Sequence, residues 1–254
     1  MFTVEEVSQK GGSGKSPGAV NVGHSFARKN MKVLMVDSDP QATLTEHLLG
    51  SRYPIGNPSF YHALKDLKRI KPIVITPRMD LLPANMDLQY GEIELQRKAN
   101  FQMRTAKLLE LYANDYDICV IDTPGSVSMY TVLALAAGDQ VIIPVKTELN
   151  HVRALVDTME TIKDVQESGL NSRLKIWGIL PTQHEMNTLH HQEALQILKH
   201  TYGELVYSEI SNKTTKYNDA VTLKGDVGIL DAELARFWDK ITDGLLENER
   251  RREV

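Results

Sequence analysis

Residues 9–16 read Gln-Lys-Gly-Gly-Ser-Gly-Lys-Ser, and this stretch decides the fold. It follows an apolar segment, residues 2–7, that we expect to be a strand although Glu5 and Glu6 interrupt it. It precedes residues 17–29, which have the pattern of a helix. A glycine-rich turn between a strand and a helix lets successive backbone N–H groups face a phosphate, and the helix N-terminus adds partial positive charge. The stretch therefore predicts a phosphate-binding loop.

The side chains of this loop point to a nucleotide as the ligand. In such a loop Lys15 reaches the β- and γ-phosphates, and the hydroxyl of Ser16 binds Mg²⁺. The general pattern G-x-x-x-x-G-K-[ST] requires glycine where this chain has Gln9, whereas the variant K-G-G-x-G-K-[ST], which begins at Lys10, matches. The alternative, a solvated turn rich in lysine and glycine, accounts less well for the strand and helix on either side.

Five further apolar runs have the character of buried strands. They are continuous rather than alternating, which indicates strands covered on both faces. Helix-length segments separate them, and this order favours an open, mostly parallel sheet with helices on both faces. We expect a single-domain, three-layer α/β fold. The expected strands are residues 32–36, 79–82, 118–121, 141–145 and 176–180, and the expected helices are residues 17–29, 96–112, 155–167, 189–202 and 232–248.

The composition excludes several classes of protein. With 254 residues, 42% of them hydrophobic, the chain can bury a core without disulfides. Its single cysteine, Cys119, cannot form an internal disulfide, and its apolar neighbours predict a buried thiol in a reducing cytosol. No apolar run has the length of a membrane span. The net charge of −4 argues against a histone-like protein but leaves a local basic patch open.

Two regions call for a narrower interpretation. Residues 1–248 are expected to form one domain, and residues 249–254, which contain three consecutive arginines, a basic and solvated tail. Four histidines of the C-terminal half have irregular spacing and no cysteine or paired carboxylate beside them, so we expect no metal site there. These are His184, His190, His191 and His200.

Three motifs together resemble the ParA/MinD group of P-loop ATPases. The first is the variant loop. The second is Val-Asp-Ser-Asp-Pro-Gln-Ala at residues 36–42, which matches the group's V-D-x-D-P-Q segment, and the third is Val-Ile-Asp-Thr-Pro at residues 120–124, which is similar to its Walker B strand. They occur in the group's order and spacing. The resemblance implies a P-loop NTPase fold, the cofactors ATP and Mg²⁺, and weak ATP hydrolysis that a partner protein stimulates.

The resemblance also implies roles for individual residues. Asp37 is expected to orient the attacking water and Asp122 to support the Mg²⁺ shell, although strand-end turns and a helix N-cap are the alternatives for such aspartates. Lys10 is expected to cross to the ATP of a second subunit, so that ATP joins two subunits into a sandwich dimer. The expected nucleotide-binding residues of the loop are Gly11, Gly12, Ser13, Gly14, Lys15, Ser16 and Pro17.

Three positions depart from the family pattern or extend it. Pro17 replaces a threonine and removes a hydroxyl and an N–H near the α-phosphate, which predicts weaker nucleotide affinity or slower turnover. Lys146 follows a strand end, where it can supplement Lys10 at the phosphates or form a salt bridge or a solvated charge at the rim. Thr182 is the expected base-side residue, because the family places adenine contacts near that point.

The expected task of the ATPase is partition or positioning of a cargo. A ParA-like dimer binds nucleoid DNA without sequence preference through phosphate contacts, and a ParB-like or McdB-like adaptor on a plasmid, chromosome or protein body such as the carboxysome stimulates hydrolysis. The alternative is a MinD-like membrane-surface switch, which needs an apolar helical face that the basic tail lacks. A metabolic iron–sulfur relative needs more cysteine ligands than this chain has. The expected DNA-binding residues are Lys213, Lys216, Lys199 and Lys224.

Overall fold

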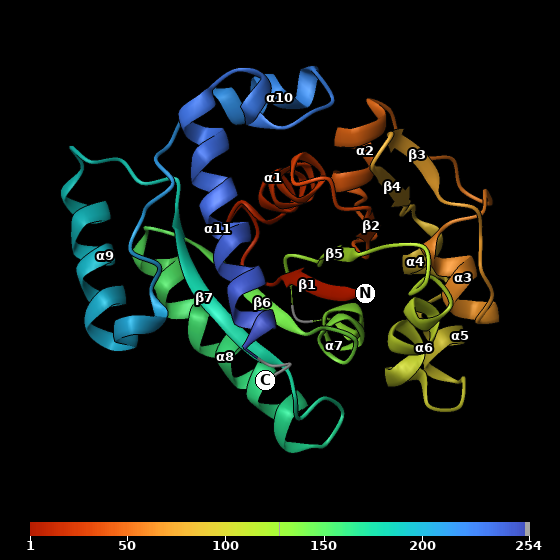
Figure 1. Cartoon of the computed structure of the whole chain (residues 1–254). Coiled ribbons are helices and arrows are strands. Elements are labelled where there is room, and N and C mark those ends of the chain that lie inside the picture. Colours follow the sequence, from red (N-terminus) through yellow and green to blue (C-terminus); the bar gives the residue numbers. More distant parts are fainter. Residues whose placement is uncertain (127, 252–254) are drawn as a thin grey trace.

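A seven-stranded sheet forms the centre of the computed structural model, which describes residues 1–126 and 128–251 (Figure 1). The strand order is β3-β4-β2-β5-β1-β6-β7, and all neighbouring pairs are parallel except β3 and β4. The strand before the glycine-rich loop, β1, therefore lies between β5 and β6. The strands are β1 (Phe2–Glu6), β2 (Val33–Asp37), β3 (Ile73–Thr76), β4 (Met79–Leu82), β5 (Ile118–Asp122), β6 (Gln140–Lys146) and β7 (Lys175–Thr182).

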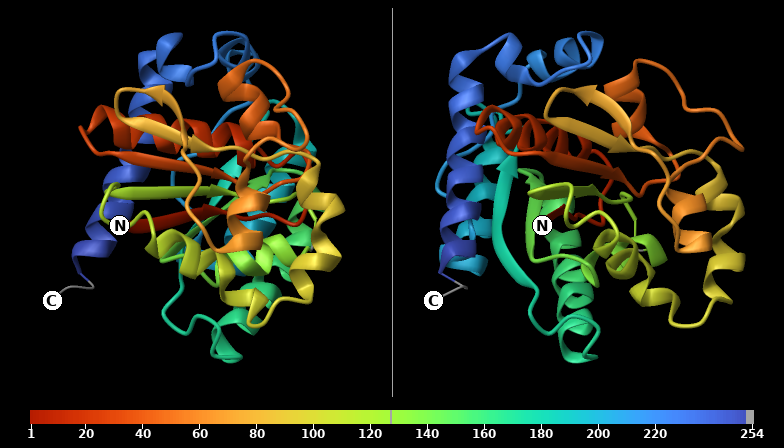
Figure 2. Two further views of the ribbon diagram at one scale, coloured as in Figure 1. Left: turned by 90° about the vertical axis from the view of Figure 1, so that its right-hand side faces the viewer. Right: turned by 45° about the vertical axis from the view of Figure 1, so that its right-hand side comes forward.

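Helices cover both faces of the sheet, as Figures 1 and 2 show from three directions. One face packs against α1, α2 and α11, and the other against α3, α6, α7 and α8. This is the three-layer α/β fold that the sequence predicts. The helices in the described part of the chain are α1 (Lys15–Arg28), α2 (Thr43–Leu49), α3 (Phe60–Asp66), α4 (Asp87–Tyr90), α5 (Glu92–Gln96), α6 (Arg104–Glu110), α7 (Met129–Leu135), α8 (Leu149–Glu167), α9 (Leu189–Tyr202), α10 (Lys216–Thr222) and α11 (Ala232–Arg250).

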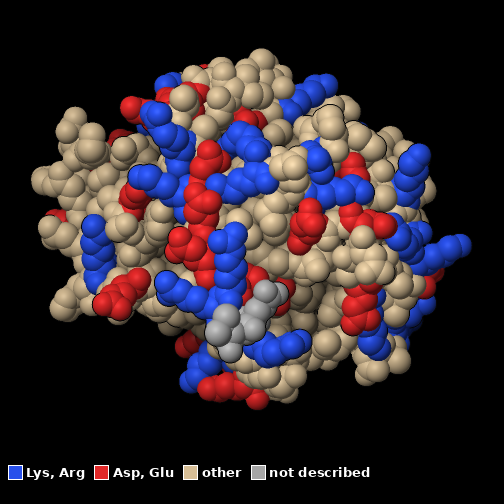
Figure 3. Space-filling view, viewed as in Figure 1, with Lys and Arg blue, Asp and Glu red and all other residues tan. Residues whose placement is uncertain are grey.

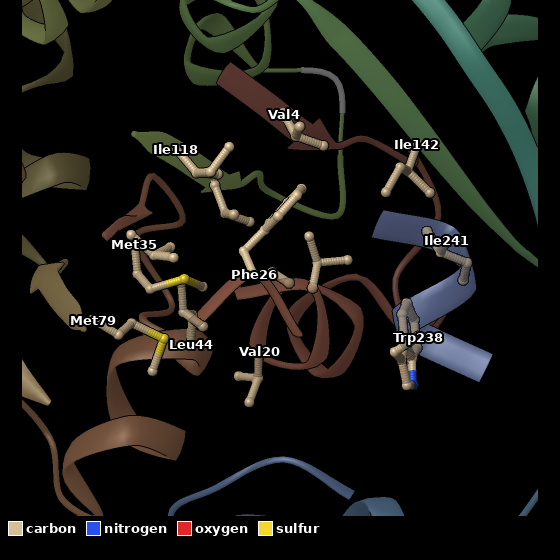
Figure 4. Packing of buried hydrophobic residues seen from close by; sticks show 14 of the residues in the cluster. Val4, Val20, Phe26, Met35, Leu44, Met79, Ile118, Ile142, Trp238 and Ile241 are labelled. Carbon is tan, nitrogen blue, oxygen red and sulfur yellow. The ribbon is translucent and has the colours of Figure 1, made fainter. Parts of the chain in front are cut away.

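The core between the sheet, α1 and α11 is apolar and continuous (Figure 4). Val4, Ile118 and Ile142 come from three adjacent strands and belong to one cluster with Phe26 of α1. The apolar stripe of α11 lies in the same cluster, through Trp238 and its helical neighbours. Burial of each large side chain stabilises the fold by roughly 1.5–3 kcal/mol relative to exposure. The stripe therefore serves as core packing.

Most of the expected elements are confirmed. Each of the five expected strands in residues 32–180 lies within two residues of the predicted bounds. The helix expected at residues 189–202 is α9 with the same bounds, whereas the helix expected at residues 155–167 begins earlier, at Leu149. The first strand is also confirmed, and it buries Glu5 and Glu6 completely. Two buried acids inside a central strand are unusual, and one of them, Glu6, belongs to the site described below.

The single helix expected at residues 96–112 is wrong. The chain there forms α5, a 3₁₀ turn (Phe101–Met103) and α6. Asn100 adopts a φ of 52°, in the left-handed region, which interrupts a continuous helix. Arg104 turns inward at the start of α6 and donates hydrogen bonds to the carbonyls of Leu64 and Lys65. Tertiary contacts of α6 with α3 therefore override the helical periodicity.

The edge strand β3 was not expected. It is four residues long, runs antiparallel to β4, and lies between Pro72 and Pro77. Prolines beside a strand are compatible with a sheet edge, where one side of the backbone needs no partner. Val74 is 68% exposed, so β3 is not buried on both faces, which is the property that predicted the other strands.

The end of the last helix overlaps the expected tail. Glu249 and Arg250 belong to the last turn of α11, and Arg251 follows it, so the expected tail does not begin at residue 249. Residues 252–254 lie outside the described residues. Cys119 is buried and unpaired in β5, as predicted. No helix in the described part of the chain is long and apolar enough to cross a membrane.

Candidate functional site

The glycine-rich loop leads from β1 into α1 at the carboxyl edge of the sheet. Gly12 and Gly14 have φ values of 77° and 96°, a region that side chains with a Cβ rarely adopt. Gly14 stands directly before α1, so the N–H groups of the loop and of the first helical turn face the same space. A cavity of about 660 Å³ lies there, lined by residues 11–17 together with Asp39, Gly125 and other residues. The expected phosphate-binding loop therefore surrounds one cavity.

Three buried acids form a row beneath this loop. Asp37, Asp122 and Glu6 end the adjacent parallel strands β2, β5 and β1, and they are paired in register across the sheet. Each is 0% exposed. The carboxylate of Glu6 packs against α1 so closely that a Cβ on Gly18 would lie 2.2 Å from its Oε2. Burial raises the pKa of all three carboxyl groups, so the row beside the loop is poised to gain negative charge when a cation binds.

Lys15 is the cation at this row. It is the first residue of α1 and is only 6% exposed. Burial lowers the pKa of its ammonium group. Three carboxylates oppose that shift, those of Asp122, Asp39 and Glu6. A buried ammonium at a helix N-terminus between acids is suited to exchange these partners for phosphate oxygens.

The site has the ligands for a magnesium ion. Neither carboxylate oxygen of Asp122 has a hydrogen-bond partner among the described residues. Burial raises the pKa of Asp122 to about 7, against the effect of the nearby hydroxyl of Ser16 and of Lys15. Carboxylate and hydroxyl oxygens are the donors that Mg²⁺ takes alongside phosphates. Ser16 and Asp122 therefore fit the expected metal role, and the alternative of a helix N-cap does not apply, because Ser128 caps α7.

The structure separates Asp37 from the cavity. Oδ2 of Asp37 accepts hydrogen bonds from the backbone N–H (2.8 Å) and the hydroxyl (2.7 Å) of Thr45, and Oδ1 accepts one from the N–H of Asp39. Asp37 lines no part of the cavity, whereas Asp39 does. Oδ2 of Asp37 is thus used to hold the first turn of α2, and Oδ1 to hold the turn before it. This geometry does not support the expected contact of Asp37 with a water molecule, and Asp39 is the aspartate of this segment that lines the cavity.

Lys10 lies at the outer edge of the loop. It is exposed and does not line its own cavity. The preceding residue is anchored to α8, since the backbone N–H of Gln9 donates to Thr158 and its side-chain amide to Thr161. The loop therefore presents Lys10 outward on a fixed base.

The segment after β7 docks on the glycine-rich loop. The hydroxyl of Thr182 donates to the carbonyl of Ser13 (2.7 Å), and the amide of Gln183 donates to the carbonyl of Gly12 (2.7 Å). Gln183 has a φ of 49°, which strains a residue other than glycine. The sequence did not single out Gln183, and no local pattern marks it.

A smaller chamber of about 200 Å³ adjoins the phosphate cavity. It shares Gly14, Pro17 and Gln183 with that cavity, and Thr182, Tyr217 and Trp238 are among its other walls. Tyr217 is fixed by hydrogen bonds with Ser211 and with the indole N–H of Trp238. An aromatic wall beside a phosphate loop can accommodate the nucleoside half of a nucleotide. The expected base-side position of Thr182 agrees with this placement.

Lys146 forms the salt bridge that was one of its alternatives. Its Nζ lies 2.6 Å from Oε1 of Glu148, and it does not line the phosphate cavity. The carboxylate beside it neutralises the charge that would assist the phosphates, so the interpretation as a second phosphate lysine is not supported. Pro17, by contrast, lines both the cavity and the chamber, as expected for a nucleotide-binding position.

Comparison with known proteins gives the family. A family model described as an AAA domain matches residues 3–176. The chain is 30% identical over 255 residues to the chromosome-partitioning ATPase Soj of Treponema pallidum, with 98% of this chain and 99% of Soj covered. It is 31% identical over 254 residues to the chromosome partitioning protein ParA of Caulobacter vibrioides, with 97% and 94% covered. The chain belongs to the ParA/Soj family of P-loop ATPases. It is therefore an ATP hydrolase whose cofactors are ATP and Mg²⁺.

Solved structures agree with the ParA/Soj fold. Cobyrinic acid a,c-diamide synthase from Mycobacterium smegmatis, with bound ADP and magnesium, is 28% identical and superimposes with a TM-score of 0.81 over 98% of this chain and 96% of the enzyme. The ATP complex of a point variant of Cyanothece McdA has a TM-score of 0.86 at 21% identity, with 96% of each chain covered, and shows the fold alone.

The structure pairs the two leading DNA-binding candidates of this ParA-like ATPase with carboxylates. Lys213 lies 2.6 Å from Glu185, and Lys216 forms an ion pair with Asp231. Lys199 and Lys224 are exposed, on α9 and directly after α10. The four lysines therefore differ in how much charge they present to solvent. On the face seen in Figure 3, Lys and Arg are interspersed with Asp and Glu over α11.

Two of the four histidines that the sequence drew attention to contact one threonine in the interior of the ParA-like chain. His184 and His191 are buried on either side of Thr147, whose hydroxyl lies 3.0 Å and 2.7 Å from their respective Nδ1 atoms. Among the described residues, no group of three or more His, Cys, Asp or Glu side chains is arranged to hold a metal ion. The buried histidines are structural, since they join β6 to the start of α9.

Proposed function

We propose that this protein is a partition-type ATPase that forms an ATP-sandwich dimer, binds nucleoid DNA without sequence preference, and positions a cargo through adaptor-stimulated hydrolysis. The observation that carries the proposal is the placement of Lys10. Lys10 is exposed and lines no part of the cavity, whereas Lys15 is buried at the row of acids beneath the same loop. A second copy of the chain brings its own Lys10 to the phosphates, as the family resemblance implies.

An apolar rim beside the cavity supports the dimer. Tyr90 and Ile93 are 69% and 65% exposed, and they alternate with Gln89 and Glu92, which line the cavity. Large apolar side chains at this level of exposure next to a ligand site are typical of a surface that a protein partner covers. The rim and Lys10 are thus available to the same partner.

The dimer is tested by light scattering with a slowly hydrolysed ATP analogue. The wild-type protein is expected to double in mass with the analogue and Mg²⁺ but not with ADP. Lys10→Ala is expected to stay monomeric while it retains analogue binding, because its side chain does not line its own cavity. Lys163→Ala, which changes a lysine 68% exposed on α8, is the matched control and is expected to dimerise. Dimerisation of Lys10→Ala at wild-type concentrations would refute the role.

Asp39 is the proposed water-positioning group. It lines the cavity and is one of the charges acting on Lys15, and its Oδ1 is held by the N–H of Gln41 at 2.8 Å. Phosphoryl transfer needs a carboxylate that orients the attacking water and cations that neutralise the charge on the phosphates. Within this chain, Asp39 and Lys15 supply those two elements. Asp37 then acts as a structural support for α2.

DNA binding is the part of the proposal that depends on surface lysines. Lys199 and Lys224 are the two candidates that form no ion pair within the described residues, and a dimer doubles both. Because counterion release drives such binding, retention on DNA is expected to fall steeply with salt. Lys199→Glu combined with Lys224→Glu is expected to abolish retention on DNA with ATP and to leave ATP binding intact. Retention equal to wild type would exclude these two lysines from the DNA contact.

The MinD-like alternative has a specific structural difficulty. A membrane-targeting helix needs an unburied apolar face. In α11 that face is buried, because Phe237, Trp238 and Ile241 pack into the core. Co-sedimentation with anionic liposomes or with DNA, each in the presence of ATP, separates the two functions. The cargo and its adaptor are identified by what co-purifies with the ATP-bound dimer.

A further inference from the structure

An ion pair closes the rim of the nucleoside chamber. Nζ of Lys213 lies 2.6 Å from Oε1 of Glu185, and Lys213 lines both the 200 Å³ chamber and a neighbouring groove. The backbones of the two segments are also joined, since the N–H of His184 donates to the carbonyl of Ser211 and the N–H of Lys213 to the carbonyl of His184. The lysine is therefore held at a defined place on the rim of the chamber, with its side chain 60% exposed.

Glu185 is itself fixed. Its Oε2 accepts a hydrogen bond from the hydroxyl of Thr188 at 3.3 Å, while Oε1 pairs with Lys213. The segment that carries Glu185 follows Thr182 and Gln183, which dock on the glycine-rich loop. The position of Lys213 is thus linked through a short chain of contacts to the loop that binds phosphate.

The position of the chamber beside the glycine-rich loop indicates which part of a nucleotide it holds. A triphosphate on the glycine-rich loop leaves the nucleoside half near Gly14, Pro17 and Gln183, the residues that the cavity and the chamber share. The base and ribose of ATP carry ring nitrogens and oxygens that accept hydrogen bonds. The ammonium of Lys213 supplies three donors at the rim.

We propose that Lys213 donates a hydrogen bond to the nucleoside half of ATP, and that Glu185 is the positioning residue that holds it there. This inference rests on the proposed function in that ATP occupies the loop and the chamber together. It removes Lys213 from the DNA-binding set and gives it a task within the ATP site.

The chain contains a closely matched control. Lys240 and Glu209 form an ion pair with the same 2.6 Å separation and the same exposed fractions, 60% and 40%, as Lys213 and Glu185. Neither Lys240 nor Glu209 lines the cavity, the chamber or the groove. If the substitutions act only by removing a surface charge or a surface ion pair, the variants of both pairs are expected to change ATP binding equally. If Lys213 contacts the nucleoside, only the variants of the Lys213–Glu185 pair are expected to change it.

The test compares two ligands on the full chain by calorimetry. ATP with Mg²⁺ reports both halves of the site, and inorganic tripolyphosphate with Mg²⁺ reports the phosphate half alone. Measurements at about 0.15 M salt limit remote charge effects, because the screening length is about 8 Å. The variants are Lys213→Met, which keeps an unbranched apolar stem without the ammonium group, Glu185→Gln, and the controls Lys240→Met and Glu209→Gln.

Lys213→Met is expected to bind ATP about fivefold to tenfold more weakly and tripolyphosphate as the wild type does, since one charge-assisted hydrogen bond at a partly exposed rim is lost. Glu185→Gln is expected to weaken ATP binding alone, by about twofold to threefold, and the controls to change neither ligand. Equal weakening of both ligands, or no change in ATP binding, would overturn the inference. Failure of the wild-type protein to bind either ligand would instead count against the proposed function.

Discussion

The phosphate cavity and the chamber beside it share Gly14, Pro17 and Gln183, yet their remaining walls are built differently. The loop of the phosphate cavity stands above strand ends, where Asp37, Asp122 and Glu6 are buried and paired in register across three parallel strands. The rim of the chamber consists of two loop segments, which His184 and Lys213 join through backbone hydrogen bonds. The phosphate half of the site is therefore built on the sheet itself, whereas the rim of the nucleoside half is built from loops that pack beside the sheet.

The difference has consequences for function. Core packing fixes the positions of carboxyl groups on buried strand ends. Such fixed positions suit groups that must meet a transferring phosphoryl group in one geometry. Side chains on loops tolerate substitution and adjust to a ligand. We therefore expect substitutions in the phosphate half to change catalysis or stability strongly, and those in the chamber to change affinity moderately.

The largest effect is expected when Asp37, the last residue of β2, and Asp39 are each replaced by asparagine in separate variants. Asp39→Asn is expected to lower kcat by about 100-fold and to leave ATP binding within about twofold, because it removes the charge that orients water but no part of the fold. Asp37→Asn is expected to destabilise the protein by about 1–3 kcal/mol, since an amide cannot accept all three hydrogen bonds from Thr45 and Asp39.

Steady-state ATPase rates, calorimetry and thermal unfolding of both variants distinguish the roles. Both proteins carry the same change of charge two residues apart, so each is the control for the other. A variant Asp37→Asn with an unchanged melting temperature and a kcat as low as that of Asp39→Asn would reverse the assignment.

A second prediction concerns how the stability of the folded protein depends on pH through the buried acids of the phosphate half. Burial raises the pKa of Asp122 to about 7 and also raises that of Asp37. Between the ordinary range near 3.8 and the raised value, the folded, metal-free protein keeps a proton that the unfolded chain has lost. The stability from this proton is complete below the ordinary pKa and is lost as the pH rises through about 7.

The melting temperature in EDTA is accordingly expected to fall by about 3–5 °C per pH unit between about pH 5.5 and 7. Asp122→Asn is expected to reduce this slope, because an amide does not titrate, and the buried carboxyl group of Asp37 is expected to keep the remainder. Asp243→Asn, which changes an aspartate 60% exposed on α11, is the control and is expected to keep it. An equal slope in wild type and Asp122→Asn would contradict the pKa shift as its cause.

The same contrast explains how far the sequence could be interpreted. The phosphate half is encoded by short contiguous motifs, and the structure brings Lys15, Ser16 and Asp122 together as predicted. The hydrogen bonds of Asp37 with Thr45 could not be predicted, because they form only after α2 has packed. The chamber was predicted only at Thr182, since its other walls, such as Tyr217 of α10 and Trp238 of α11, come from segments distant in the sequence.

The fold follows the same division. Strands buried on both faces, such as β5 and β6, have a continuous apolar sequence, and their contacts in the folded protein favour the same strand structure that this sequence predicts. The region of residues 96–112 could not be predicted, because its periodicity was helical while Asn100 and the inward turn of Arg104 were set by packing against α3. Sequence patterns therefore predicted the elements that the sheet orders and missed those that contacts between loops and short helices decide.

The smallest effect is expected at Pro17, which lies where the two halves meet. Pro17→Thr restores a backbone N–H and a hydroxyl in the first turn of α1, next to Gly14 and Ser16, where N–H groups have no partner within the helix. ATP affinity measured by calorimetry is expected to rise about twofold to threefold, and tripolyphosphate affinity to rise in parallel, because the added donors face the phosphates. Pro17→Ala restores the N–H alone and separates its contribution from that of the hydroxyl. Since Pro17 lines both spaces, a rise confined to ATP would place the new contact in the chamber and assign the residue to the nucleoside half.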